Sequence, residues 1–165
     1  MMITLTGFMG SGKTTVGKVL ADFLGCPFMD LDDLVVKKAG KSIPDIFSQD
    51  GEPAFRALEA QVLRKTVDKY TESTVVLALG GGAILAPASA ALLHEKTVCI
   101  YLRATLDTLL QRLAGETAGR PLADDSLAGR LAEREPVYEK TAHVIIDTDG
   151  LTPDEVADEI IISAL

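Results

Sequence analysis

The sequence predicts an α/β fold in which a five-stranded parallel β-sheet lies between two layers of helices. Five short apolar runs alternate along the chain with longer segments in which apolar residues recur at helical spacing. Strands that alternate with helices form parallel sheets whose two faces are both covered. The length of 165 residues suits one domain with its own core, so we expect residues 1–165 to form a single domain.

The predicted strands are runs of apolar and β-branched residues. The clearest is the run from residue 74 to residue 79, which ends in three consecutive glycines. Ligands of parallel α/β sheets gather at the carboxyl ends of the strands, so these glycines are candidates for a binding site. In chain order, the strands are expected at residues 3–6, 27–29, 74–79, 98–102 and 144–146.

The predicted helices are marked by apolar spacing and by capping residues. The first begins near Lys13 and ends at Gly25, a residue type that commonly terminates helices. Ser42, Thr105 and Thr152 are each expected to cap a helix, and the segments after Ser42 and Thr152 read as capping boxes. Helical faces are further marked by Phe55, Leu58 and Val62, and by Leu106, Leu109, Leu110 and Leu113.

Composition and charge exclude several classes of protein. The net charge of −8 argues against nucleic-acid binding, which requires a basic surface. Two cysteines are too few for a disulfide framework and indicate a reducing compartment. Apolar runs stay short of the ~20 residues that span a bilayer, and the first residues do not resemble a signal peptide. We therefore expect a cytoplasmic protein without a membrane partner.

The strongest motif is the segment Gly-Phe-Met-Gly-Ser-Gly-Lys-Thr at residues 7–14, which matches G-x-x-x-x-G-K-[ST] between a strand and a helix. In such a loop the glycines turn backbone N–H groups toward phosphate oxygens, and the helix N-terminus adds its positive end. Lys13 would reach the β- and γ-phosphates, and the Thr14 hydroxyl would ligate Mg²⁺. The alternative is a glycine-rich turn with a chance lysine, which the strand–loop–helix context makes a poor explanation.

Carboxylates follow the second strand, where they can face the phosphate site. Asp30, Asp32 and Asp33 can serve an outer-shell Mg²⁺ contact or accept a proton from a substrate hydroxyl. Asp32 and Asp33 suit acidic capping of the next helix equally well. The spacing alone leaves both interpretations open.

Arginines and glycines give weaker signals when each is taken alone. Arg56 could simply form an i,i+4 ion pair with Glu52 on a helix surface. The three glycines at 80–82 exceed what a turn needs and would let a ligand lie on the backbone. The polar segment 115–125 lies between two helices and is a candidate for a mobile lid that carries Arg120.

These motifs together resemble the shikimate kinase family over nearly the whole chain. The matching segments are residues 7–15, 28–32, 42–47, 51–56, 79–83, 120–122 and 134–138. Phosphate-binding loops occur in many families, but this combination of motifs is far more specific. The resemblance implies a P-loop kinase fold of three layers with strand order 2-3-1-4-5, and the transfer of the ATP γ-phosphate to the 3-hydroxyl of shikimate in aromatic amino-acid biosynthesis.

The resemblance also assigns roles to individual residues. It implies that Asp32 binds shikimate hydroxyls and acts as the base. Lys13 and Arg120 are the other two implied catalytic residues. It implies that Asp30 supports Mg²⁺ through water. The implied carboxylate ligands of shikimate are Arg56 and Arg134, beside the backbone of Gly80, Gly81 and Gly82. The implied ATP-binding residues are Gly10, Ser11, Gly12, Lys13, Thr14, Thr15, Arg112 and Arg120, with Arg112 near adenine.

The resemblance further implies Mg²⁺ as cofactor, ATP and shikimate as partners, a monomer, and substrate-binding helices at about residues 31–66. One departure concerns the segment from Gly150 to Pro153, where many members carry a basic residue and this chain has Leu151. A gluconate kinase is the nearest rival function. A GTP-dependent switch is a more distant one, because the Asp147–Gly150 match to D-x-x-G falls on the last strand and no N-K-x-D motif is present.

Overall fold

The structure is a computed structural model that describes residues 1–116 and 125–165. Residues 117–124, which hold most of the predicted lid and Arg120, lie outside the described residues. Within the described ranges, no helix is both long and apolar enough to cross a lipid bilayer.

Five strands form one sheet in the order β2-β3-β1-β4-β5, and every neighbouring pair is parallel. The predicted sheet and strand order are therefore confirmed. Each strand lies within one or two residues of its predicted position. The strands are β1 (Met2–Thr6), β2 (Phe28–Asp30), β3 (Val75–Ala78), β4 (Val98–Arg103) and β5 (Val144–Asp147).

Eight α-helices and one short 3₁₀-helix fill the described connections. One of them, α5, has no counterpart among the predicted helices, because it is rich in small residues that mark no distinct face. Helix α2 was expected only as the helix that Asp32 or Asp33 would cap. The helices are α1 (Lys13–Leu24), α2 (Leu31–Ala39), α3 (Ile43–Asp50), α4 (Glu52–Tyr70), η1 (Ala83–Leu85), α5 (Pro87–Lys96), α6 (Leu106–Glu116), α7 (Asp125–Thr141) and α8 (Pro153–Ala164).

The predicted caps are present. Thr152 and Glu155 exchange both bonds of a capping box at the start of α8. Ser42 Oγ accepts from the backbone N–H of Asp45, so this cap forms as expected, although only Ser42 contributes a side-chain bond. Thr105 Oγ1 accepts from the N–H of Thr108 ahead of α6. Local sequence therefore fixes where these three helices begin.

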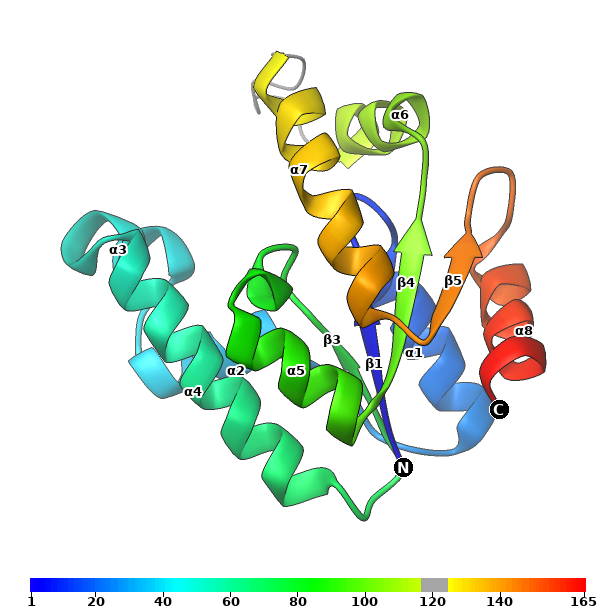
Figure 1. Cartoon of the computed structure of the whole chain (residues 1–165), viewed down its shortest axis with the longest axis horizontal. Coiled ribbons are helices and arrows are strands. Elements are labelled where there is room, and N and C mark those ends of the chain that lie inside the picture. The colour runs from blue at the N-terminus through cyan, green and yellow to red at the C-terminus, as the bar shows by residue number, and fades with distance from the viewer. Residues whose placement is uncertain (117–124) are drawn as a thin grey trace.

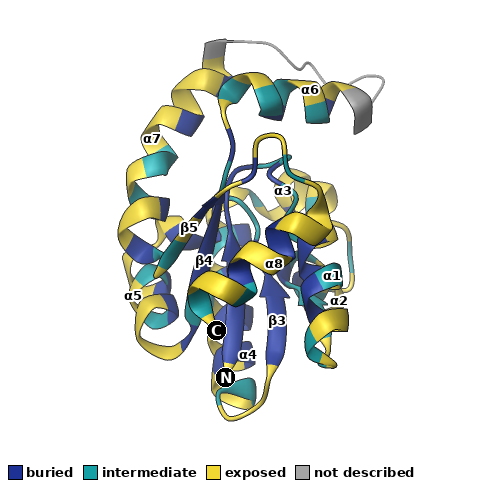
Figure 2. Cartoon of the chain, turned by 90° about the vertical axis from the view of Figure 1, so that its right-hand side faces the viewer, coloured by how far each residue is buried: buried dark blue, intermediate teal, exposed yellow. Residues whose placement is uncertain are grey.

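The sheet lies between two helical layers (Figures 1 and 2). Helices α1 and α8 cover one face, where they pack on Ile3, Leu5 and Ile100. The other face lies under α4, α5 and α7, and its core includes Leu77 and Tyr101. Side chains of a strand alternate between the two faces, so the central strands supply both cores. Strands β1 and β3 are wholly buried, whereas the edge strands β2 and β5 are partly exposed.

Because the strands are parallel, their carboxyl ends share one edge of the sheet. The loop after β1, the aspartates after β2 and the glycines after β3 all meet at this edge. The order β2-β3-β1 places these three ends side by side. The topology therefore assembles one site from segments as distant in sequence as Gly7 and Gly82.

Candidate active site

The loop between β1 and α1 has the geometry of a phosphate-binding loop. Gly12 has φ 95°, a left-handed conformation in which a residue with a side chain is strained. At position 7 an alanine Cβ would lie 2.6 Å from the carbonyl oxygen of Leu102, so only glycine fits there. The first turn of α1 then begins at Lys13 with its N–H groups directed toward the loop.

Lys13 folds back across this loop. Its Nζ donates to the carbonyl oxygens of Gly7 at 2.7 Å and Phe8 at 2.9 Å. Burial of the ammonium group lowers the pKa of Lys13 from 10.5 to about 8, although the charges of Asp32 and Asp30 oppose the shift. The lysine therefore remains charged at neutral pH, but burial makes its charge costly. A bound anion would lower this cost.

Asp30 joins the second strand to the loop. Its Oδ2 accepts from the Thr14 hydroxyl at 3.2 Å, and its Oδ1 accepts from the backbone N–H of Asp32 at 2.9 Å. The second bond makes Asp30 the N-cap of α2. The capping role that spacing had offered to Asp32 or Asp33 therefore belongs to Asp30, and the Asp32 carboxylate is left for other contacts.

Asp32 lies in the first turn of α2 and points toward the glycines that follow β3. An alanine Cβ at position 80 would lie 3.0 Å from Asp32 Oδ1. Burial raises the pKa of the Asp32 carboxyl, and the charge of Asp30 adds to the shift, while Lys13 opposes it. A carboxylate with a raised pKa at the edge of a phosphate-binding loop is a candidate general base.

Arg56 is held by a buried carboxylate that the sequence analysis did not single out. Its Nη1 donates to Glu59 Oε1 at 2.9 Å, and only 3 % of the Glu59 side chain is exposed. The predicted surface pair with Glu52 also exists, but at 3.7 Å from Nε and with an exposed partner. Glu59 could have been noticed as the i,i+3 acidic neighbour of Arg56 on a face of α4 that is otherwise apolar.

The three glycines after β3 give the arginines room. An alanine Cβ at position 82 would lie 2.4 Å from Arg56 Nη1, and one at position 81 would lie 3.4 Å from Arg134 Nη1. The Gly81 carbonyl accepts from the Tyr138 hydroxyl at 2.6 Å, which ties α7 to this loop. Arg134, one turn before Tyr138, lies with its guanidinium 5.6 Å from the centre of the Phe8 ring.

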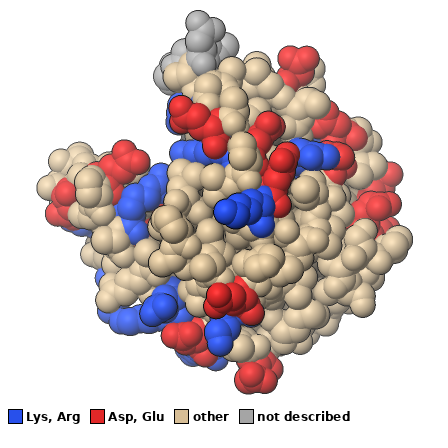
Figure 3. Space-filling model, viewed as in Figure 1, with Lys and Arg blue, Asp and Glu red and all other residues tan. Residues whose placement is uncertain are grey.

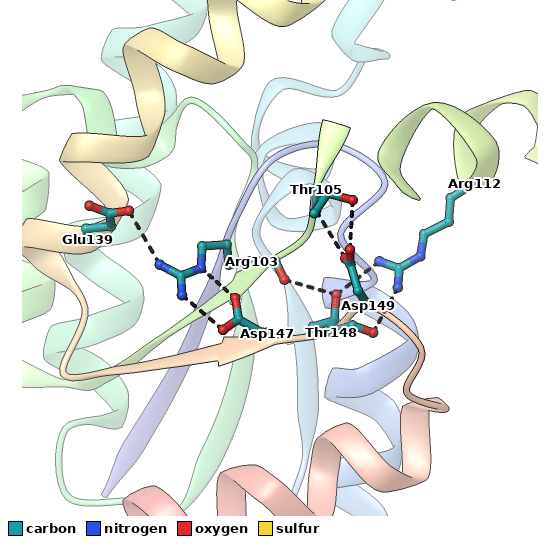
Figure 4. A network of polar contacts seen from close by, with 7 residues as sticks. All are labelled: Arg103, Thr105, Arg112, Glu139, Asp147, Thr148 and Asp149. Carbon is teal, nitrogen blue, oxygen red and sulfur yellow. Dashed lines mark hydrogen bonds and ion pairs between the residues drawn. The ribbon is translucent and has the colours of Figure 1, made fainter. Parts of the chain in front are cut away.

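Arg112 lies beside the phosphate-binding loop and points toward Thr148 (Figure 4). Its guanidinium donates to the carbonyl oxygens of Gly10 and Ser11, each at 3.3 Å, and to Thr148 after β5. A cavity of about 190 Å³ opens here, and its lining includes Thr15 and Leu151. Arg112 therefore forms one wall of a small pocket beside the loop. The lining residues that follow β5 include Thr148 and the apolar Leu151.

Three buried side-chain oxygens of the described residues have no hydrogen-bond partner: Thr6 Oγ1, Ser11 Oγ and Glu59 Oε2. All three belong to the segments that build this edge of the sheet. Unpaired buried polar atoms are costly and are rare away from functional sites. Their concentration here indicates a site whose hydrogen bonds are completed by a ligand or by water.

The structure thus brings together most of the predicted site residues. Lys13, Thr14, Asp30 and Asp32 lie in contact or in close electrostatic range, and Arg56 and Arg134 reach the glycines from two different helices. Arg120 lies outside the described residues, so its predicted place in the site stays a prediction.

Comparisons with known proteins agree with this geometry. The family model described as shikimate kinase matches residues 9–164. A shikimate kinase of Salinibacter ruber is 44 % identical over 162 residues, which span 90 % of this chain and 78 % of that protein. A shikimate kinase of Enterococcus faecalis is 40 % identical over 164 residues, which span 96 % of this chain and 95 % of that protein.

A solved structure has the same fold with close agreement. Shikimate kinase from Acinetobacter baumannii in complex with shikimate superposes with a TM-score of 0.85 and 34 % identity, covering 97 % of this chain and 90 % of that one. The family model matches nearly all residues, and the relatives are 40 % identical or more over most of the chain. The chain belongs to the shikimate kinase family.

Proposed function

We propose that this chain transfers the γ-phosphoryl group of ATP to the 3-hydroxyl of shikimate, giving shikimate 3-phosphate and ADP as a step of aromatic amino-acid biosynthesis. One observation supports this above the others: Arg56, Arg134 and Asp32 converge on the glycines at 80–82, beside the lysine of a phosphate-binding loop. Two guanidinium groups suit a carboxylate, and a carboxylate suits a hydroxyl. Shikimate carries both groups on one ring.

On the shikimate side, Arg56 and Arg134 would bind the ring carboxylate. Glu59 holds the Arg56 guanidinium at 2.9 Å, which reduces the entropy lost when the substrate binds. Backbone groups of Gly80, Gly81 and Gly82 would lie against the ring, because these residues have no side chains to keep it away. Asp32 would accept hydrogen bonds from the ring hydroxyls.

On the ATP side, the backbone of residues 10–15 would surround the phosphates. Lys13 would contact the β- and γ-phosphates, and its charge is only weakly compensated by its present carbonyl partners. Adenine would occupy the pocket beside Arg112, with Leu151 supplying an apolar contact in place of the basic residue that many family members carry.

The chain offers a donor set that fits Mg²⁺, which prefers oxygen ligands and retains several waters. Thr14 Oγ1 and Asp30 Oδ2 lie 3.2 Å apart at the mouth of the loop. Thr14 would ligate the ion, and Asp30 would hold it through water. Bound there together with ATP, the ion would supply charge neutralisation of the phosphate oxygens.

The reaction itself needs little covalent participation by the protein. The substrate oxygen forms a bond to the γ-phosphorus as the bond from that phosphorus to the ADP oxygen breaks, and the hydroxyl proton passes to Asp32. Burial raises the pKa of Asp32, so its carboxyl is a better proton acceptor than an exposed aspartate. Lys13 stabilises the charge that moves onto ADP.

The wider organisation is also a proposal. Helices α2, α3 and α4 lie within residues 31–70 and would form the substrate-binding part of one domain that spans residues 1–165. We propose that residues 115–125 act as a lid that brings Arg120 to the phosphates, and that the chain is a cytoplasmic monomer. The lid assignment rests on the polar sequence between α6 and α7 and on the family resemblance.

Release of ADP tests the assignment directly. With ATP and Mg²⁺ present, we expect turnover that depends on shikimate and that falls strongly when quinate or gluconate replaces it. Removal of Mg²⁺ with a chelator should abolish turnover. Equal or greater turnover with gluconate would contradict the shikimate assignment and leave a kinase with a different acceptor.

A further inference from the structure

A second hollow lies between α2 and α4, toward the C-terminal ends of both helices. Its volume is about 450 Å³, the size of pocket that takes small organic molecules. Its floor is apolar and includes Leu34, Val62 and Tyr70. We call it the lysine groove, because Lys37 and Lys38 of α2 and Lys65 and Lys69 of α4 line it.

The lysine groove concentrates positive charge on a protein of net charge −8. Four of the chain's 16 basic residues line it, and none of its ten lining residues is acidic. Within residues 1–116 and 125–165, no carboxylate lies within 4.0 Å of any of the four ammonium groups. Figure 3 shows blue side chains gathered at the lower left of the molecule, on the side where α2 and α4 lie.

Helix electrostatics explain only part of this arrangement. Lysines in a last turn interact favourably with the negative end of a helix, and Lys37, Lys38 and Lys69 are so placed. Lys65 lies a full turn earlier on α4 and gains little from that end. Four like charges around one hollow also repel one another, and an anion bound between them would offset this repulsion.

The apolar floor restricts the chemistry of the occupant. The Lys69 ammonium lies 5.1 Å from the centre of the Tyr70 ring, so charge and aromatic surface lie together at the rim. Met29 and Leu34 are partly exposed within the hollow. A simple inorganic anion would leave this apolar surface in water, whereas a ring with an acidic substituent would cover it.

We propose that the lysine groove binds a small amphipathic organic anion, with an aromatic or alicyclic body on the floor and a carboxylate, sulfonate or phosphate group between the lysines of the two walls. The groove shares no residue with the candidate active site. Along α4, Lys69 lies 13 residues beyond Arg56, or roughly 20 Å at the rise of an α-helix. The site therefore exists whether or not the proposed function is correct.

The same helices connect the two sites. Asp32 and Arg56 lie near the N-terminal ends of α2 and α4, and the lysine groove lies between the C-terminal parts. An anion that bridges the two walls would fix the two helices relative to each other.

The probe for this site is 8-anilinonaphthalene-1-sulfonate, an aromatic sulfonate whose fluorescence rises on binding. Two comparison ligands separate its features: N-phenyl-1-naphthylamine, which has the rings without the charge, and inorganic pyrophosphate, which has charge without the rings. The test variant is Lys65→Gln/Lys69→Gln, and the matched control is Lys18→Gln/Lys96→Gln, which removes two exposed lysines from α1 and α5. Circular dichroism melting verifies that each variant is folded.

We expect the test variant to bind the sulfonate about tenfold more weakly than the wild type, since two exposed charges each contribute modestly. The control variant should bind it normally, and binding of the uncharged amine should be the same in all three proteins. Lys37→Gln/Lys38→Gln on the other wall should cause a loss of similar size. Unchanged sulfonate binding in both wall variants would overturn the proposal, and pyrophosphate binding as tight as that of the sulfonate would overturn the proposed ligand class.

Discussion

The candidate active site and the polar network between β4 and β5 treat their charged groups in opposite ways. In the site, burial raises the pKa of Asp32 and of Glu59, so each carboxylate is less stable ionised than it would be in water. In the network of Figure 4, hydrogen bonds lower the pKa of Asp147 and of Asp149. The folded protein therefore destabilises the ionised carboxylates of the site and stabilises those of the network.

The contacts explain the difference. Arg103 donates to both oxygens of Asp147, at 2.6 Å and 3.0 Å, and reaches Glu139 at 3.6 Å. Thr105 donates from its N–H and its hydroxyl to Asp149. The site instead contains Ser11 Oγ and Glu59 Oε2 without partners. Burial without enough hydrogen bonds therefore raises the pKa of the site carboxylates, whereas direct hydrogen bonds lower the pKa of those in the network.

The largest effect is expected for Asp32→Asn. This change keeps the shape of the side chain and removes the proton acceptor, so kcat should fall by roughly 10²–10⁴-fold. Because burial raises the pKa of Asp32, its ionised form destabilises the folded protein at pH values above that pKa, and the penalty fades as the pH falls toward 3.8. The variant should therefore be at least as stable as the wild type at pH 7 in urea unfolding. A normal kcat would show that Asp32 is not the proton acceptor.

Lys13→Met should lower kcat by roughly 10²–10³-fold, the range for loss of one preorganised group that stabilises transition-state charge. Its pKa of about 8 in the fold lies below the unfolded value of 10.5, so the charged lysine destabilises the folded state fully below pH 8, and the penalty is lost between pH 8 and 10.5. The variant should gain no more than about 3 kcal/mol at pH 7. Urea unfolding at pH 7 and pH 10 checks this, because the gain must be smaller at pH 10.

Arg56→Ala and Arg134→Ala should each raise the KM for shikimate by roughly tenfold to a hundredfold, with the KM for ATP nearly unchanged. Loss of one hydrogen-bonded charged partner typically costs ~1.5–3 kcal/mol. The matched controls are Arg64→Ala and Arg130→Ala, which remove exposed arginines from the same two helices. If Arg56→Ala keeps the wild-type KM, its pairs with Glu52 and Glu59 are its whole role.

The smallest effect is expected for Arg103→Ala. Arg103 and Asp147 are 37 % and 69 % exposed, so solvent screens their pair and its loss should cost no more than about 1 kcal/mol. The contribution should persist at neutral pH and disappear as the pH falls below 3.8, because pairing lowers the pKa of Asp147. Urea unfolding in low salt and in 1 M salt measures it, and kcat should not change. A large loss of kcat would show that the Arg103–Asp147 pair also contributes to the active site.

The phosphate-binding loop, the strand positions and several helix starts could be predicted from the sequence alone. These features depend on local chemistry: glycines that permit left-handed backbone, a threonine that caps the next N–H groups, and apolar runs of strand length. Gly12, Thr152 and the run before the three glycines illustrate this. The family resemblance carried the strand order, because local spacing does not tell which strands become neighbours.

The roles of the polar residues that the sequence left ambiguous depend on the folded structure. Asp30, and not Asp32 or Asp33, caps α2, since its backbone leaves β2 in an extended conformation that suits a cap. Glu59 holds Arg56 because α4 lies against the β3 loop and buries that face. Burial and neighbouring charge set whether a carboxylate is a cap, an ion-pair partner or a base, and both depend on residues that are distant in sequence.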